Sequence, residues 1–244
     1  VFGVSDYQSP KIPDLQYADK DALAFVEWLK SSEGLQISED NIKLYTNETA
    51  TTAQLDVALD WLLEKCKTGD KAFFYFSGHG DAENSTRSKR GFLLCYDSPP
   101  NNYAAGAYGL IYFQDKISTL SLENNAKVIV ILDACRAGKL AGSQNGGTQA
   151  TAAELAQQYG NEIKLLSCQP DENSIEGRQW GNGRGVFSYY LTDGLYGLAD
   201  GNKDDTISLL ELGRYLQDKI RFDIDPIPQT PMIIGRSGEK ISTV

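Results

Sequence analysis

Two uninterrupted apolar runs constrain the fold of this 244-residue chain more than any other feature. They are residues 72–76 (AFFYF) and 128–132 (VIVIL). A strand with one face in water alternates apolar and polar residues, whereas a strand of a parallel sheet is buried on both faces and is apolar throughout. The two runs therefore predict central strands of a mostly parallel sheet, with helices packed on both of its faces.

The rest of the chain alternates short apolar segments with amphipathic stretches, as expected for an α/β protein. Further strands are predicted at residues 42–45, 163–166 and 232–234, with an added hairpin arm at 91–96. Helices are predicted at residues 17–31, 52–67, 113–120, 150–159, 186–198 and 209–220. Residues 1–4 are typical of the end of a buried strand, which predicts that the sequence begins inside a longer chain.

The charge balance of the chain narrows the range of its partners. Lys and Arg number 23, whereas Asp and Glu number 33, which gives a formal net charge of −10. An acidic protein repels phosphate backbones, so we expect no nucleic-acid partner and favour a basic ligand. No apolar run approaches the roughly 18 residues of a membrane-spanning helix, so no membrane association is expected.

The chain contains four cysteines and one histidine. Four cysteines are too few for a disulfide scaffold in a chain of this length. They lie in predicted helices and buried strands, which indicates a reducing compartment, the cytoplasm. A single histidine, His79, excludes zinc and iron sites that are built from several histidines. Any catalysis that pairs a histidine with a cysteine or a serine must therefore use His79.

Reactive side chains follow both apolar runs at the point where each strand is expected to end. The first run continues into residues 77–80 (SGHG) and the second into residues 133–135 (DAC). The carboxyl ends of parallel strands share one edge of the sheet, where the functional sites of such sheets form. Taken singly, a cysteine or a histidine at a strand end is more often structural. Together they favour a thiolate nucleophile, Cys135, that is activated by the imidazole of His79.

The motifs at residues 75–80 (YFSGHG) and 133–138 (DACRAG) resemble those of the peptidase C14 family, which comprises caspases, metacaspases and bacterial caspase-like proteases. Cys135 follows His79 by 56 residues, and the caspase signature places its histidine about 50 residues before the cysteine. Segments at 15–25, 167–176, 185–195 and 229–231 also resemble that family, so the resemblance covers nearly the whole chain. Animal caspases have Gln ahead of the nucleophile, whereas Asp133 here is similar to metacaspases and bacterial orthocaspases.

The resemblance implies a single peptidase domain with the caspase-like fold. This fold is a three-layer α/β sandwich, in which a six-stranded, mostly parallel sheet has helices on both faces. The domain would divide into a large-subunit-like part (1–138), a linker (139–162) and a small-subunit-like part (163–244). Residues 138–148 are rich in Gly, Ser, Gln and Asn, which is typical either of a solvated loop or of a processing or gating loop.

The resemblance also implies the roles of individual site residues. The backbone N–H groups of Gly80 and Cys135 would hold the oxyanion that forms during attack. The acidic pocket of metacaspases matches Asp21, Ser77 and Asp133, and carboxylates in such a pocket select Arg or Lys. In a purely structural role, Asp21 would stabilise a helix start and Asp133 would accept hydrogen bonds from loop amides. No third catalytic side chain is evident, so we expect a Cys–His dyad.

A second motif, residues 200–211 (DGNKDDTISLLE), has the spacing of an EF-hand calcium loop. Asp205 replaces the glycine that is usual at the sixth position, and the sequence has no partner loop. The motif is either a Ca²⁺ site or a turn followed by a helix cap, and we expect no cofactor to be required for catalysis. The oxygen ligands of a Ca²⁺ site here would be Asp200, Asn202, Asp204, Thr206, Ser208 and Glu211.

These features together predict a cysteine endopeptidase that cleaves protein or peptide substrates after Arg or Lys, with Lys139 as a candidate site of self-cleavage. The alternatives are a catalytically silent caspase-like scaffold and a calcium-responsive binding module. The presence of both Cys135 and His79 argues against the silent scaffold. The oligomeric state stays open, because active animal caspases dimerise whereas metacaspases are generally monomers.

Overall fold

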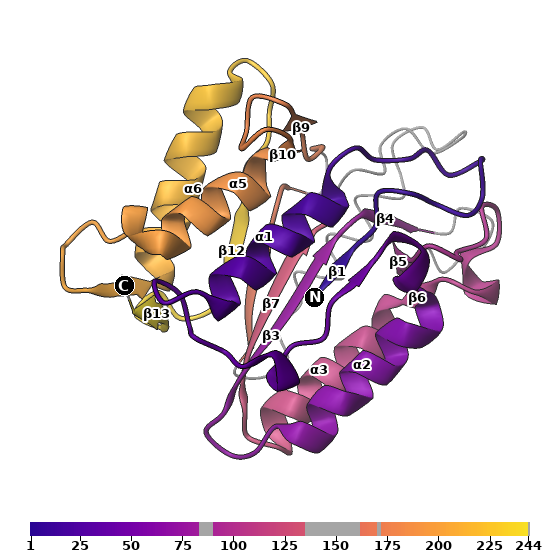
Figure 1. Cartoon of the computed structure of the whole chain (residues 1–244), viewed down its shortest axis with the longest axis horizontal. Helices are drawn as coiled ribbons and strands as arrows, with labels where there is room; N and C mark the ends of the chain where they lie inside the picture. Colours follow the sequence, from indigo (N-terminus) through magenta and orange to yellow (C-terminus); the bar gives the residue numbers. More distant parts are fainter. Residues whose placement is uncertain (83–89, 135–161, 170–171, 244) are drawn as a thin grey trace.

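A six-stranded sheet runs through the middle of the computed structural model, which describes residues 1–82, 90–134, 162–169 and 172–243 (Figure 1). The strand order is β12-β8-β7-β3-β1-β2, and all neighbours are parallel except β12, which is antiparallel to β8. The predicted sheet is thus confirmed. The strands are β1 (Phe2–Gly3), β2 (Tyr45–Thr46), β3 (Lys71–Ser77), β7 (Lys127–Asp133), β8 (Glu162–Leu166) and β12 (Met232–Ile234).

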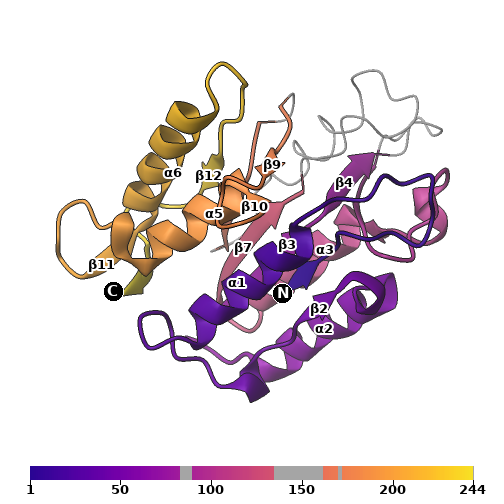
Figure 2. The same ribbon diagram turned by 45° about the horizontal axis from the view of Figure 1, so that its top comes forward.

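Helices cover both faces of the sheet (Figure 1, Figure 2). One face carries α1 (Ala18–Lys30), α5 (Val186–Asp193) and α6 (Leu209–Ile224), and the other carries α2 (Thr52–Lys65) and α3 (Leu110–Leu122). Successive residues of β7 enter different cores, since Val130 packs with α2 and α3, whereas Ile131 packs with α1, α5 and α6. This arrangement explains the continuous apolar runs, because both faces of the central strands are removed from water.

Short strand pairs outside the central sheet shape its surroundings. The predicted hairpin arm at 91–96 is confirmed as part of a separate three-stranded antiparallel sheet. The first strand of this sheet follows β3 almost directly in the chain. Its strands are β4 (His79–Ala82), β5 (Gly91–Leu94) and β6 (Tyr108–Gly109). Two further antiparallel pairs are β9 (Glu176–Gly177) with β10 (Arg184–Gly185), and β11 (Thr206–Ser208) with β13 (Lys240–Thr243).

Some predicted elements differ from the structure in their extent. The strand predicted at 42–45 is paired only at Tyr45–Thr46, because β1 offers it only Phe2 and Gly3 as partners. The helix predicted at 186–198 is α-helical as far as Asp193, and a π-helical turn, Gly194–Leu198, follows it. The helix predicted at 150–159 lies outside the described residues. Three 3-10 turns complete the fold, at Glu39–Asn41, Asn47–Thr49 and Tyr103–Ala105.

The close approach of α1 to the sheet places its first turn beside the carboxyl ends of the strands. A Cβ atom at Gly3 would lie 2.5 Å from the carbonyl oxygen of Ala18, so only glycine allows this separation. Asp21 of α1 is therefore held over the end of β3, where Ser77 is the last strand residue. Among the described residues, no helix has the length and apolar character needed to cross a membrane.

Candidate active site

His79 is held in one orientation by two segments near the start of the chain. Its backbone N–H donates to the hydroxyl oxygen of Tyr7 over 2.8 Å, and the two rings stack with their centroids 5.1 Å apart. Its Nε2 atom lies 2.8 Å from the carbonyl oxygen of Pro13. The imidazole is almost completely buried, with 3% of the residue exposed. Packing and hydrogen bonding therefore leave this side chain little rotational freedom.

The contact with Pro13 determines which ring nitrogen can act as a base. A carbonyl oxygen only accepts hydrogen bonds, so Nε2 of His79 must carry the proton in this contact. In the neutral ring, the lone pair then resides on Nδ1. His79 is thus oriented by a backbone carbonyl rather than by a third side chain. This role of Pro13 was not predictable from the sequence, because any residue can supply a backbone carbonyl oxygen.

Cys135 lies outside the described residues, and Ala134 is the last described residue before it. The register of β3 and β7 nevertheless shows how the two strands that precede the motifs are aligned. Ser77 is paired with Asp133, and the N–H of Gly78 donates to the carbonyl oxygen of Asp133 over 3.1 Å. His79 follows Ser77 by two residues, and Cys135 follows Asp133 by two residues. Ser77 and Asp133 thus lie at the same sheet edge, and the meeting of His79 with Cys135 stays a prediction.

The three described cysteines are buried and make poor nucleophiles. Burial, followed by the negative charge of Asp70, raises the pKa of the Cys66 thiol. Burial also raises the pKa of the Cys95 thiol. Cys168 donates from Sγ to the carbonyl oxygen of Glu172 over 3.3 Å. Because the thiolate is the reactive form of cysteine, a raised pKa lowers reactivity at neutral pH.

The predicted pocket residues Asp21, Ser77 and Asp133 come together at the carboxyl ends of β3 and β7, and all three are fully buried. The hydroxyl of Ser77 donates to Oδ2 of Asp21 over 3.3 Å. Asp133 accepts hydrogen bonds from the hydroxyls of Ser174 and Ser188, over 2.6 and 2.7 Å. Segments that are distant in sequence thus converge on two carboxylates at the edge predicted for the site.

The hydroxyl groups around Asp133 form a connected network. Ser188 Oγ lies 2.7 Å from the hydroxyl of Tyr75, and Nε2 of Gln229 donates to Ser174 Oγ over 3.1 Å. Burial and the nearby carboxylates of Asp21 and Asp133 raise the pKa of Tyr75, so its hydroxyl stays protonated. Buried polar groups that are fully bonded in this way hold a site in a single arrangement.

An arginine that the sequence analysis did not identify also belongs to this cluster. Nε of Arg184 donates to Oδ1 of Asp21 over 2.6 Å, and Nη2 donates to the carbonyl oxygen of Ser188 over 3.2 Å. The N–H of Gly185 adds contacts of 3.0 and 3.1 Å to the two oxygens of Asp21. The only sequence signal for Arg184 is that a basic residue lies between two glycines, Gly183 and Gly185. This signal does not indicate which residue Arg184 binds.

The predicted oxyanion donors are placed only in part. Gly80 lies in β4 beside His79 and opposite Leu93 of β5. The other donor, the N–H of Cys135, lies outside the described residues. The pairing of the two donors stays a prediction.

The EF-hand-like loop forms a turn followed by a helix cap. Asp200 accepts hydrogen bonds from the N–H groups of residues 203, 204 and 205. Ser208 and Glu211 form a reciprocal capping box at the start of α6. Asp205 adopts the left-handed conformation, with φ at 59°, which is the conformation the loop requires at its sixth position. In the part of the chain that the structure describes, no group of three or more His, Cys, Asp or Glu side chains is arranged to hold a metal ion. Calcium binding by this loop remains an untested prediction.

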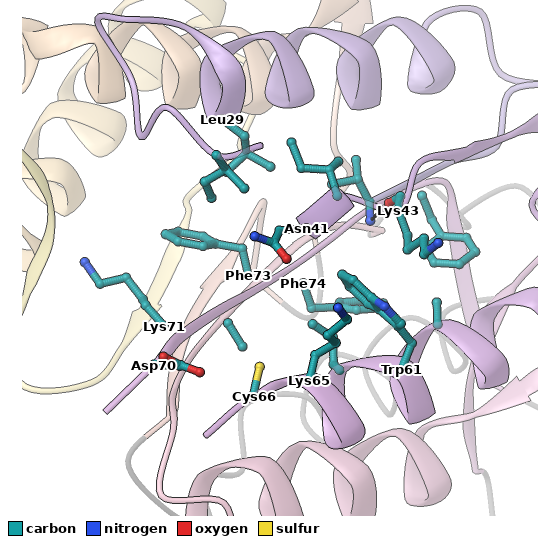
Figure 3. Close-up of a pocket in the computed structure, with 17 residues that line it drawn as sticks. Leu29, Asn41, Lys43, Trp61, Lys65, Cys66, Asp70, Lys71, Phe73 and Phe74 are labelled. Atoms are coloured by element: carbon teal, nitrogen blue, oxygen red, sulfur yellow. Dashed lines mark hydrogen bonds between the residues drawn. The ribbon is translucent and has the colours of Figure 1, made fainter. Parts of the chain in front are cut away.

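Figure 3 shows a cavity of about 330 Å³ that is lined by the first residues of β3, whereas His79 follows the last residue of this strand. It is bounded by residues 41–43 on one side, by residues 71–74 of β3 on the other, and by side chains of α1 and α2. Phe2 of β1, which pairs with both Tyr45 and Phe76, also lines this cavity. The cavity shares no residue with the site at the carboxyl ends.

Comparisons with known proteins agree with this fold. The family model described as the caspase domain of peptidase C14 matches residues 1–234. Protein GSU0716 from Geobacter sulfurreducens is similar in structure, with a TM-score of 0.61 and 17% identity, covering 96% of this chain and 92% of that one. A structure described as pro-sf-caspase-1 has a TM-score of 0.57 and 14% identity, covering 96% of this chain and 85% of that one. No curated protein matches the chain significantly. On the evidence of the family match over nearly its whole length, together with the fold and the position of His79, the chain belongs to the caspase domain family.

Proposed function

We propose that this protein is a cysteine endopeptidase that cleaves after Arg or Lys, with Cys135 as nucleophile and His79 as its acid and base. Members of the caspase family are typically cysteine peptidases and act on protein substrates. The observation that carries the proposal is the placement of His79. His79 is oriented by the Pro13 carbonyl beside the end of β7. It follows Ser77, the strand partner of Asp133, by two residues, and Cys135 follows Asp133 by two residues as well.

The proposed reaction uses each nitrogen of His79 for one purpose. Nε2 stays bound to the Pro13 carbonyl, and Nδ1 takes the proton of the Cys135 thiol. The thiolate attacks the peptide carbonyl carbon, and the N–H groups of Gly80 and Cys135 stabilise the oxyanion. Such donors typically contribute about 2.7–4 kcal/mol of transition-state stabilisation each. Collapse of the intermediate releases the amine, which takes the proton from His79 and leaves a thioester on Cys135. Water activated by His79 then hydrolyses the thioester and restores the free thiol.

The acidic cluster supports the choice of a basic residue before the scissile bond. Asp21, Ser77 and Asp133 lie beside the end of β7, which leads directly to the nucleophile. A carboxylate in a water-poor site binds guanidinium and ammonium groups through charge-assisted hydrogen bonds and disfavours acidic side chains. The acidic chain as a whole, with a formal net charge of −10, also attracts basic peptides.

A panel of fluorogenic peptides that differ only in the residue before the cleaved bond tests the proposal. Peptides with Arg or Lys at that position are expected to be hydrolysed at least about 100-fold faster than peptides with Asp or Ala, because only basic side chains gain the charge-assisted contacts. Preferred cleavage after Asp would overturn the basic specificity. Absence of any cleavage, with the protein folded, would favour the silent scaffold.

Self-cleavage after Lys139 is expected to separate active from inactive protein. From Leu140 to Ile163 the chain has no Lys or Arg, so a protease selective for basic residues has Lys139 as its candidate site in the linker. Arg136 is too near the nucleophile to reach across it, and Arg87, Lys89 and Arg90 form a competing target. Mass spectrometry of active protein beside Cys135→Ala should show a boundary after Lys139 in the active protein alone. A single intact species with full activity would contradict this prediction.

A further inference from the structure

The acidic cluster already holds a cation that belongs to the chain itself. Arg184 is 9% exposed and binds Asp21 through Nε over 2.6 Å. Asp21 is fully buried, and it also accepts hydrogen bonds from the N–H of Gly185 and the hydroxyl of Ser77. The guanidinium thus makes the kind of contact with this carboxylate that a substrate arginine would make in the proposed pocket.

Arg184 is also connected to the second carboxylate of the cluster. Its Nη2 donates to the carbonyl oxygen of Ser188, and the hydroxyl of the same Ser188 donates to Asp133. The described cluster therefore contains two carboxylates, Asp21 and Asp133, and one guanidinium. While Arg184 stays in place, an incoming basic side chain finds Asp21 already bound to a cation.

The backbone around Arg184 holds it at the boundary between the interior and solvent. Gly181, Asn182 and Gly183 precede it with positive φ angles of 52°, 62° and 117°. The strand to which Arg184 belongs, β10, pairs with β9 over only two residues. The side chain of Arg184 adds hydrogen bonds to Asp21 and to the carbonyl oxygen of Ser188.

We propose that Arg184 is a specificity-determining residue that competes with the basic side chain of the substrate for Asp21. The inference rests on the proposed specificity for Arg or Lys. Arg184 occupies Asp21 in the protein without substrate, and full engagement of both carboxylates by a substrate requires the guanidinium to leave. Arg184 thereby limits the affinity of the pocket for basic side chains.

Binding of a small guanidinium probe tests this competition without requiring catalysis. Calorimetry would compare Cys135→Ala with Cys135→Ala/Arg184→Gln, using butylguanidinium as the probe and neutral butylurea as its matched control. The variant without the Arg184 charge is expected to bind butylguanidinium about tenfold more tightly or better, since it leaves Asp21 without its cation. Binding of butylurea should be unchanged. Equal affinity of the two proteins for butylguanidinium would overturn the proposal.

Thermal stability distinguishes the proposed competition from a purely structural role of Arg184. Thermal denaturation of the Arg184→Gln variant should show a lowered Tm that butylguanidinium restores and butylurea does not. The double change Asp21→Asn/Arg184→Gln removes both charges and should lose the gain in affinity and the rescue. A lowered Tm that the probe does not restore would identify Arg184 as a structural residue only. If Arg184→Gln does not fold, Arg184→Lys decides, with an expected gain of about threefold because lysine lacks the planar fork of donors.

The peptide panel separates failure of this inference from failure of the proposed function. Cleavage after Arg by the unmodified protein, with no gain in probe affinity on loss of Arg184, contradicts the competition alone. Absence of basic specificity in the panel, together with no binding of butylguanidinium to any variant, contradicts both.

Discussion

Cys135→Ala is expected to abolish hydrolysis of Arg and Lys peptides. Removal of a catalytic nucleophile lowers kcat by about 10⁶-fold in a serine protease, and a loss of similar scale is expected here. The same variant should no longer be labelled by thiol-directed peptide inhibitors. Hydrolysis and covalent labelling are therefore measured side by side, the first by fluorescence and the second by mass spectrometry. Persisting turnover in the Cys135→Ala protein would contradict the assignment of Cys135 as the nucleophile.

The other cysteines supply matched controls for this result. Cys66→Ala, Cys95→Ala and Cys168→Ala each remove one thiol and should keep hydrolysis and inhibitor labelling. Burial raises the pKa of Cys66 and Cys95, so their thiols stay protonated and unreactive. Loss of labelling in any of these variants would show that the inhibitor reports on a different cysteine.

His79 should be nearly as sensitive as the nucleophile. It is the only histidine of the chain, so no second imidazole can replace it. His79→Gln keeps an amide donor for the Pro13 carbonyl but has no titratable nitrogen, so it separates loss of the base from loss of the contact. Activity of His79→Gln within tenfold of the unmodified protein would exclude the proposed dyad.

Asp133→Asn is expected to lower kcat/KM for Arg peptides by the equivalent of about 2–5 kcal/mol, the range measured when one partner of a buried charge pair is removed. Asp21→Asn should also lower kcat/KM sharply, because it leaves the Arg184 guanidinium in the cluster without its carboxylate. Steady-state kinetics with Arg and Ala peptides measures both effects. The loss should be confined to the basic peptides.

A surface aspartate controls for the change in net charge. Asp218 is exposed on α6, and Asp218→Asn removes one negative charge without changing the described contacts of Asp21 or Asp133. It should leave kcat/KM for Arg peptides unchanged. Equal losses with Arg and Ala peptides in Asp133→Asn would point to damage of the fold and count against a role in specificity. A thermal unfolding curve of each variant distinguishes these cases.

Much of the fold was predictable because its signals are local. The runs at 72–76 and 128–132 are apolar throughout, and the structure explains this by burying Val130 and Ile131 in separate cores on opposite faces. The edge strand at 42–45 was predicted too long, because apolar character cannot show how many residues find a partner. Pairing at Tyr45–Thr46 depends on β1, which lies more than 40 residues away in sequence.

Part of the site was predictable for the same reason. Each apolar run is followed by reactive residues, and the parallel pairing places Ser77 and Asp133 at one sheet edge. The Pro13 carbonyl that orients His79 left no trace in the sequence, since any residue could supply that oxygen. The stacking of Tyr7 on His79 was also not predictable from the sequence, because it depends on the path of the first loop.

The sequence by itself determined the parallel sheet, the order of helices and strands, and the side chains able to act as nucleophile and base. These follow from periodicity and residue type, which neighbouring residues record. Only the tertiary structure decided that Asp21 is paired with Arg184, a residue 163 positions away. That contact depends on how closely α1 packs against Gly3 and on where the turn before Arg184 leads the chain. Such a pairing leaves no local pattern, because its energy arises only when the two segments meet in a buried site.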